Sequence, residues 1–226
     1  MLAKMTNGDL DCRHVTITVL TNSMATTDLN VVNLLAQQSL KAFQEYYASR
    51  RNELTSPRVE YFEYQASTHE NACVPQKGHP SQHVSLHTKV SIFADDMIVG
   101  SANGDVRSYM MDSNNGMIIR NAPTFMKNYQ NYIDELLKDA TRVSDLTASF
   151  RAMSHDQLIQ QDRKALECLI DKYGIRNHLH PTEIKNAEDR VVGLINEAYT
   201  LSNEILAGGK KGRDAEERYN RIFKPI

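Results

Sequence analysis

The stretch that decides the fold is residues 83–103, His-Val-Ser-Leu-His-Thr-Lys-Val-Ser-Ile-Phe-Ala-Asp-Asp-Met-Ile-Val-Gly-Ser-Ala-Asn. Apolar and polar residues alternate over residues 84–90, which is the period-two pattern of a β-strand with two different faces. A turn signal follows at Asp95–Asp96, and a second apolar run at 97–99 leads into Gly-Ser-Ala-Asn at 100–103. The pattern therefore predicts a β-hairpin whose returning strand ends beside the start of the first strand.

The predicted hairpin gathers side chains that suit phosphate chemistry. His87 and Lys89 point to the same side of the first strand, about 6–7 Å apart along it. The returning strand brings Ser101 and Asn103 back beside them. An imidazole can act as a nucleophile or as a general acid or base near neutral pH. Ammonium, amide and hydroxyl groups donate hydrogen bonds to phosphate oxygens. These residues suit either a phosphodiester site or a polar strand face that is merely solvated, and spacing alone leaves both interpretations open.

The same stretch gives no pattern of metal ligands. The two carboxylates, Asp95 and Asp96, lie in the predicted turn, where we assign them a structural role. Neither a second histidine nor a cysteine stands at ligand spacing from His87. The sequence therefore predicts phosphodiester chemistry without a metal or another cofactor.

These motifs resemble the H-x-K-D…G-S-x-N signature of the phospholipase D superfamily. The resemblance is carried by His87-x-Lys89 and by residues 100–103. Further segments in the expected order resemble the cardiolipin-synthase-like branch of that superfamily: residues 105–108, 15–23 and 59–64. The resemblance covers about residues 10–122 and implies an α/β fold, with a mixed β-sheet flanked by helices in a phospholipase D-like half-domain.

The remaining hundred or so residues change character after Pro123. Apolar residues recur there at helical spacing, and Pro181 is expected to open a long helix that stops at Gly208–Gly209. We therefore predict a catalytic half-domain over residues 1–122 and a helical C-terminal extension over residues 123–226. The helices would pack on the sheet or on a partner; peripheral contact with a lipid surface is the second interpretation.

The resemblance also implies roles for individual residues. His87 would attack phosphorus or protonate the leaving group, Lys89 and Asn103 would hold the phosphate, and Ser101 would support them. The family often carries a glutamate that orients the catalytic histidine, but Asn114 stands at that position here. We hypothesise that Asp112, two residues earlier, orients His87 instead, because a neutral amide stabilises an imidazolium less than a carboxylate does.

Weaker assignments and one departure complete the comparison. Asn22, Ser23 and Asn114 are assigned to the lining of the substrate site through the resemblance alone. Five residues separate Lys89 from Asp95 where the family usually has four, so the turn is remodelled.

The chain carries only one H-x-K motif, whereas an active site of this superfamily uses two. The second half is expected from a homodimer partner or from a segment missing before Met1. Because too few residues precede the first predicted strand for the family's opening strand and helix, we expect the C-terminal half of a longer two-motif protein. A natural truncation is the alternative.

Composition narrows the functional class. The 226 residues are 41% hydrophobic and 24% charged, with a formal net charge of −2, which lacks the basic bias of proteins that coat nucleic acid. No leader or apolar run of about 20 residues stands out, so we predict a soluble or peripheral membrane chain in a compartment that the sequence does not specify.

The expected activity is phosphodiester hydrolysis or phosphatidyl transfer on phospholipids through a phosphohistidine. A nuclease of the same superfamily and a non-catalytic phosphate-binding half-site are the alternatives.

Overall fold

The computed structural model describes residues 10–24, 26, 30–49, 57–64, 86–101 and 115–223. Its first sheet has the strand order β1-β2-β6. Strands β1 (Thr16–Asn22) and β2 (Arg58–Tyr64) are parallel, and β6 (Val143–Asp145) pairs with β2 in the antiparallel direction. A parallel pair needs a crossover connection, which α2 (Asn30–Ser49) provides. The sheet is therefore mixed, as the sequence predicted.

The second sheet is built from the predicted hairpin. Strands β3 (Val90–Phe93) and β4 (Asp96–Gly100) are antiparallel, and β5 (Gly116–Ile119) adds to the other edge of β4. The hairpin prediction is confirmed, but the first strand is shorter than expected. Residues 86–89 lie outside the strand. The backbone of Leu86 forms hydrogen bonds with the side chain of Asn22 at the end of β1, rather than with a neighbouring strand.

Helices dominate the chain after Ala122. They are α4 (Pro123–Lys138), α5 (Thr147–Ala152), α6 (His155–Lys172), the 3₁₀ turn η1 (Ile175–Asn177), α7 (Pro181–Ala207) and α8 (Gly209–Phe223). Proline at the first turn of α4 and of α7 costs no hydrogen bond there, which explains why both helices begin at a proline, as the sequence predicted for α7. The C-terminal region is helical as expected, with β6 as an added strand.

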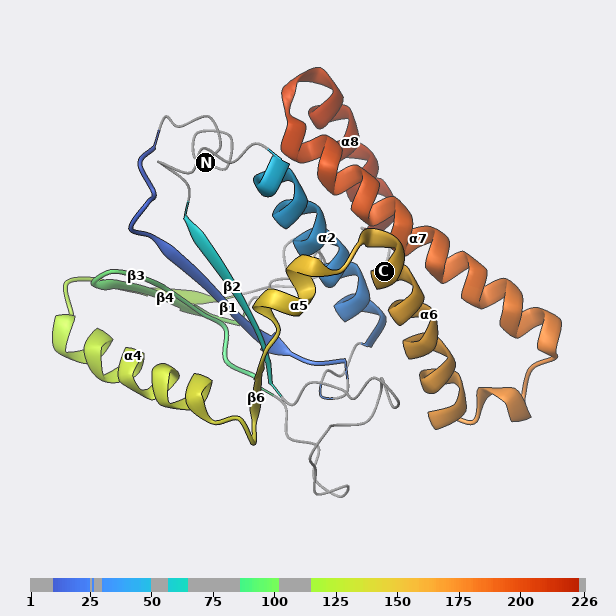
Figure 1. The fold of residues 1–226 in the computed structure, drawn as a ribbon, viewed down its shortest axis with the longest axis horizontal. Helices are drawn as coiled ribbons and strands as arrows, with labels where there is room; N and C mark the ends of the chain where they lie inside the picture. The colour runs from blue at the N-terminus through green and yellow to red at the C-terminus, as the bar shows by residue number, and fades with distance from the viewer. Residues whose placement is uncertain are drawn as a thin grey trace.

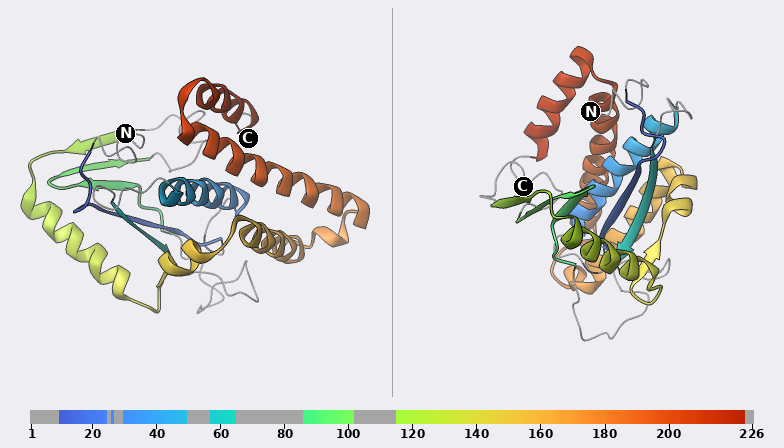
Figure 2. Two further views of the ribbon diagram at one scale, coloured as in Figure 1. Left: turned by 45° about the horizontal axis from the view of Figure 1, so that its top comes forward. Right: turned by 90° about the vertical axis from the view of Figure 1, so that its left-hand side faces the viewer.

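The two faces of the first sheet are covered by different elements (Figures 1 and 2). On one face, Tyr61 packs with Phe150 of α5 and Leu158 of α6. On the other face, Tyr64 packs with Leu136 of α4 and Val143 of β6. In both figures α4 lies on the opposite side of the strands from α7 and α8.

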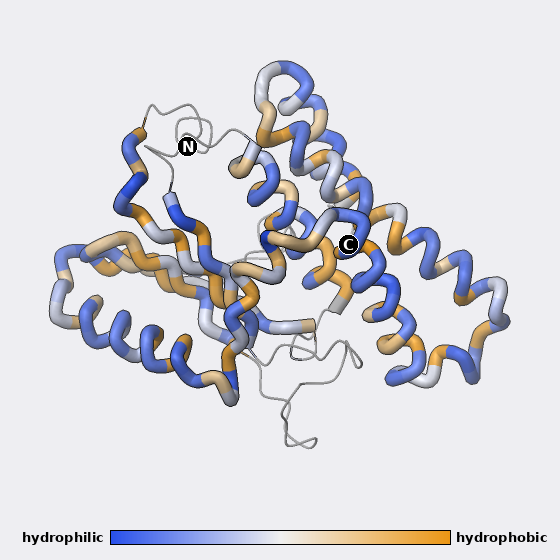
Figure 3. Tube along the Cα trace, viewed as in Figure 1, coloured by the Kyte–Doolittle hydropathy of each residue, from blue (hydrophilic) through white to orange (hydrophobic). Residues whose placement is uncertain are grey.

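The apolar stripe of helix α7 is buried inside the protein. Its buried residues include Val192 and Ile195, which pack with Leu34 of α2 and with residues of α6. Figure 3 shows the result along the trace, with apolar residues recurring among hydrophilic ones along α7. No helix in the described ranges combines the length and the apolar character that crossing a bilayer requires. Peripheral membrane contact stays a prediction.

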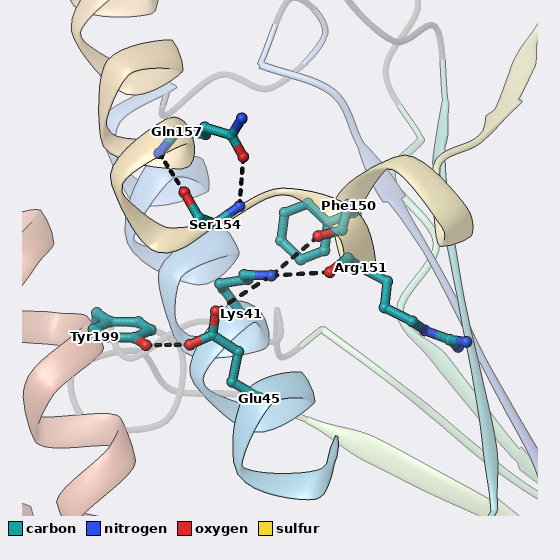
Figure 4. A network of polar contacts seen from close by, with 7 residues as sticks. All are labelled: Lys41, Glu45, Phe150, Arg151, Ser154, Gln157 and Tyr199. Atoms are coloured by element: carbon teal, nitrogen blue, oxygen red, sulfur yellow. Dashed lines mark hydrogen bonds and ion pairs between the residues drawn. The ribbon is translucent and has the colours of Figure 1, made fainter. Parts of the chain in front are cut away.

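A polar network joins α2 to the C-terminal helices (Figure 4). The Nζ atom of Lys41, a side chain only 2% exposed, donates to the carbonyl oxygens of Phe150 and Arg151 at 3.2 and 3.4 Å. It also lies 3.4 Å from Oε1 of Glu45, whose other oxygen accepts from the hydroxyl of Tyr199 on α7. One buried lysine thus caps the end of α5 and links it to α2 and α7.

A second buried contact joins α2 to α6. Nε2 of Gln38 donates to Oδ2 of Asp162 at 2.6 Å, and both side chains are shielded from solvent. Burial raises the pKa of Asp162 to about 7, although the hydrogen bond from Gln38 opposes that shift. At low and mildly acidic pH this carboxyl is therefore protonated in the folded protein.

Asp162 is expected to make folding stability fall as the pH rises. Between about pH 4 and pH 7 the unfolded chain releases this proton while the folded chain retains it, so the free energy of unfolding decreases through that window. Asp162→Asn should remove this contribution and raise the free energy of unfolding at pH 8 by about 2 kcal/mol relative to the wild type. Urea unfolding of both proteins at pH 4, 6 and 8 measures the difference; stability curves that run parallel with pH would contradict the assignment.

Candidate active site

The hairpin is closed by a two-residue turn, Ala94–Asp95, because Phe93 faces Asp96 across the ladder. Ala94 adopts a positive φ of 51°, as the first central residue of a tight hairpin turn does. Asp95 is exposed in this turn, and Oδ1 of Asp96 accepts from the backbone N–H of Asn121, just before α4, at 3.4 Å. Both aspartates lie at the end of the hairpin that is remote from Lys89.

The open end of the hairpin holds His87 and Lys89 opposite residues 100–101. The backbone N–H of Gly100 donates to the carbonyl oxygen of Lys89 at 3.1 Å, which continues the β3–β4 ladder by one bond. The described parts of the two motif halves, residues 87–89 and 100–101, therefore meet at this hydrogen bond. The side chain of His87 is exposed, and Nζ of Lys89 donates to the main-chain oxygen of His87 at 2.9 Å. The ammonium group thus lies against the histidine backbone.

Ser101 is held within the second sheet. Its backbone N–H donates to the carbonyl oxygen of Asn115 at 2.9 Å, and its Oγ accepts from the N–H of Asn115 at 3.0 Å. These bonds join the end of β4 to the start of β5, beside Lys89. The remaining catalytic predictions, Asn103 and Asp112, and the weaker prediction Asn114 lie outside the described residues.

The two lining residues predicted at the end of β1, Asn22 and Ser23, have different surroundings. Ser23 is fully buried, with Oγ 3.3 Å from Oγ1 of Thr26 and its backbone N–H bonded to the carbonyl oxygen of Tyr64. Asn22 is half-buried, and its carboxamide makes two hydrogen bonds to the backbone of Leu86, the residue before His87. The structure therefore brings Asn22, and not Ser23, to the segment that carries His87.

Glu63 is a buried carboxylate that sequence reasoning did not select. It accepts hydrogen bonds from the hydroxyl of Tyr61 and from Nε2 of Gln37, the latter at 2.8 Å. Burial raises its pKa, and these two hydrogen bonds oppose the shift. Its contacts with Tyr61 and Gln37 place it on the α2 face of the sheet, whereas Tyr64 packs in the cluster that contains Leu86. Glu63 thus supports the fold on the face away from His87.

No group of three His, Cys, Asp or Glu side chains within the described ranges is placed to hold a metal ion. Beside His87 lies instead a cationic hydrogen-bond donor, the ammonium of Lys89. Such a group suits the binding of an anion more than that of a cation.

Comparison with known protein families finds a match to this chain. The model described as "Cardiolipin synthase, PLD-like domain" matches residues 6–137, more than half of the chain. The chain belongs to this family. The match includes the hairpin, His87 and Lys89, and it confirms the resemblance drawn from the sequence motifs. Membership in this PLD-like family supports an association with phosphodiesterase and phosphatidyl-transfer proteins in general. No curated protein and no solved structure matches the chain.

Proposed function

We propose that this chain carries one half of an active site for phosphodiester hydrolysis or phosphatidyl transfer on phospholipids. The observation that carries the proposal is the hydrogen bond from the backbone N–H of Gly100 to the carbonyl oxygen of Lys89. This hydrogen bond holds the two halves of the family motif together. His87 is exposed at this point, so a substrate phosphate can reach its imidazole. The ammonium of Lys89 beside it supplies a positive charge for the phosphate oxygens.

The proposed reaction has two steps. An imidazole nitrogen of His87 attacks phosphorus, the bond from phosphorus to the leaving oxygen breaks, and a histidine of the second half-site protonates that oxygen. Water or a lipid alcohol then loses its proton to that second histidine and attacks phosphorus, and the phosphorus–nitrogen bond breaks. Water gives hydrolysis and a lipid alcohol gives phosphatidyl transfer. In the opposite arrangement, His87 is the acid for the nucleophile of the other half.

The second half-site comes from a second copy of this chain or from a segment outside it. Asn103 and Ser101 are proposed to complete the phosphate contacts, and Asp112 is proposed to orient the imidazole of His87. We assign no metal or other cofactor to the reaction, since the attacking group is a side chain and the proton carriers are histidines.

The test is turnover of a phospholipid in EDTA, measured together with the molar mass of the protein by light scattering. We expect release of the head group from phosphatidylglycerol vesicles by a dimeric species, with no loss of rate on addition of chelator. Turnover of single-stranded DNA but not of lipid would replace the substrate assignment with a nuclease. No turnover of either substrate by a dimer would leave a non-catalytic phosphate-binding half-site.

A further inference from the structure

The carboxamide of Asn22 forms hydrogen bonds with both backbone polar groups of a single distant residue, Leu86. Its Nδ2 donates to the carbonyl oxygen of Leu86 at 2.8 Å, and its Oδ1 accepts from the backbone N–H of Leu86 at 2.7 Å. The two bonds join positions 64 residues apart in the sequence. A primary amide that donates and accepts on one residue fixes both the position and the orientation of that residue.

Asn22 is itself held by β2, by α2 and by Thr26. It is the last residue of β1 and stands opposite Tyr64 of β2 in the parallel register. Its carbonyl oxygen accepts from Nδ2 of Asn33, a buried side chain of α2, at 3.0 Å. Its Oδ1 also lies 3.4 Å from the hydroxyl of Thr26. Asn22, whose side chain holds Leu86, is therefore itself fixed by the sheet and by the crossover helix α2.

His87 follows Leu86 directly and lies outside the regular ladder. On its C-terminal side, the first ladder bond is the one from Gly100 to Lys89. On its N-terminal side, the backbone of Leu86 is held by Asn22, and the Leu86 side chain packs with the cluster around Tyr64 and Leu136. The backbone around the exposed His87 is thus held on both sides. The hydrogen bond from Gly100 holds Lys89 on the C-terminal side, and the Asn22 side chain holds Leu86 on the N-terminal side.

We infer that Asn22 is a positioning residue for His87, acting through the backbone of Leu86. The inference rests on the proposed function and gives Asn22 a role other than the lining of the substrate site. Small displacements of a reacting group are costly in rate, about 100-fold for an error of about 1 Å. The carboxamide is specifically required, because a carboxylate would set an oxygen against the Leu86 carbonyl in place of the donor.

The experiment compares Asn22→Asp and Asn22→Ala with the wild type. Asn128→Asp is the matched control, because Asn128 is an exposed residue of α4. We expect kcat on phosphatidylglycerol vesicles to fall about 10- to 100-fold in both Asn22 variants, with KM within about threefold of the wild type. The control should retain wild-type values. An unchanged kcat, or a raised KM at constant kcat, would overturn the inference in favour of no role or of substrate lining.

A second readout separates this inference from the proposed function. In the NMR spectrum, the imidazole carbon resonances of His87 should shift or broaden in Asn22→Ala, and the Leu86 amide should exchange faster with solvent. In Asn128→Asp, the His87 resonances and the exchange rate of the Leu86 amide should both match those of the wild type. If the wild type turns over no phosphodiester, the proposed function fails, and these spectra alone decide the positioning role. Unchanged His87 resonances would overturn it, and Asn22→Ala decides the matter if Asn22→Asp does not fold.

Discussion

Replacing His87 by alanine is expected to abolish phosphodiester turnover, lowering kcat/KM by about 10⁴-fold or more. The reason is chemical: the imidazole is the group proposed to form the bond to phosphorus or to protonate the leaving oxygen, and a methyl group does neither. Because the His87 side chain is exposed, its loss should leave the free energy of unfolding nearly unchanged. The measurement is the initial rate on phosphatidylglycerol vesicles, alongside urea unfolding.

His178→Ala is the matched control, since His178 is also exposed but lies in the turn before α7. It should retain the wild-type rate. A substrate labelled at phosphorus adds a direct test of the intermediate: acid-labile label should appear on the wild type during turnover and be absent from His87→Ala. A variant within tenfold of the wild-type rate would refute the assignment of His87.

Local sequence rules predicted much of the fold. The hairpin follows from alternation and a turn signal, and α7 follows from Pro181 and from Gly208–Gly209, where both glycines adopt positive φ. The same glycines turn the chain back into α8, a helix that begins where the sequence predicted only a stop. The direction of the chain after the turn depends on packing against α7, which no local pattern shows.

The long-range contacts that hold the candidate site and the rest of the fold could not be predicted in this way. Asn22 and Leu86 are 64 residues apart, and Gln38 and Asp162 are 124 apart. Each pair depends on the tertiary arrangement, and each residue taken alone is an ordinary polar or apolar position. β6 is three residues long, too short for alternation to reveal it. The residue types of the motif could be recognised in the sequence, but the residues that hold them in place could not.

The buried lysine of α2 gives the largest expected effect on stability. Lys41→Met should lower the free energy of unfolding by about 3 kcal/mol, because it keeps most of the apolar stem but removes the donor. The carbonyl oxygens of Phe150 and Arg151 would lose that donor where little water reaches them, and Glu45 would lose its ion pair. Lysine was an unexpected residue for this position, since lysine is rarely buried unless it is paired.

Lys164→Met, on the exposed surface of α6, makes the same chemical change without these contacts and should alter stability by less than about 0.5 kcal/mol. Urea unfolding at pH 7 compares the two variants. The Lys41 network joins α5, α2 and α7, so its loss should also loosen the amide protection at the end of α5 before global unfolding (Figure 4). Equal stability of the two variants would mean that the stem of Lys41, and not its charge, holds the helices together.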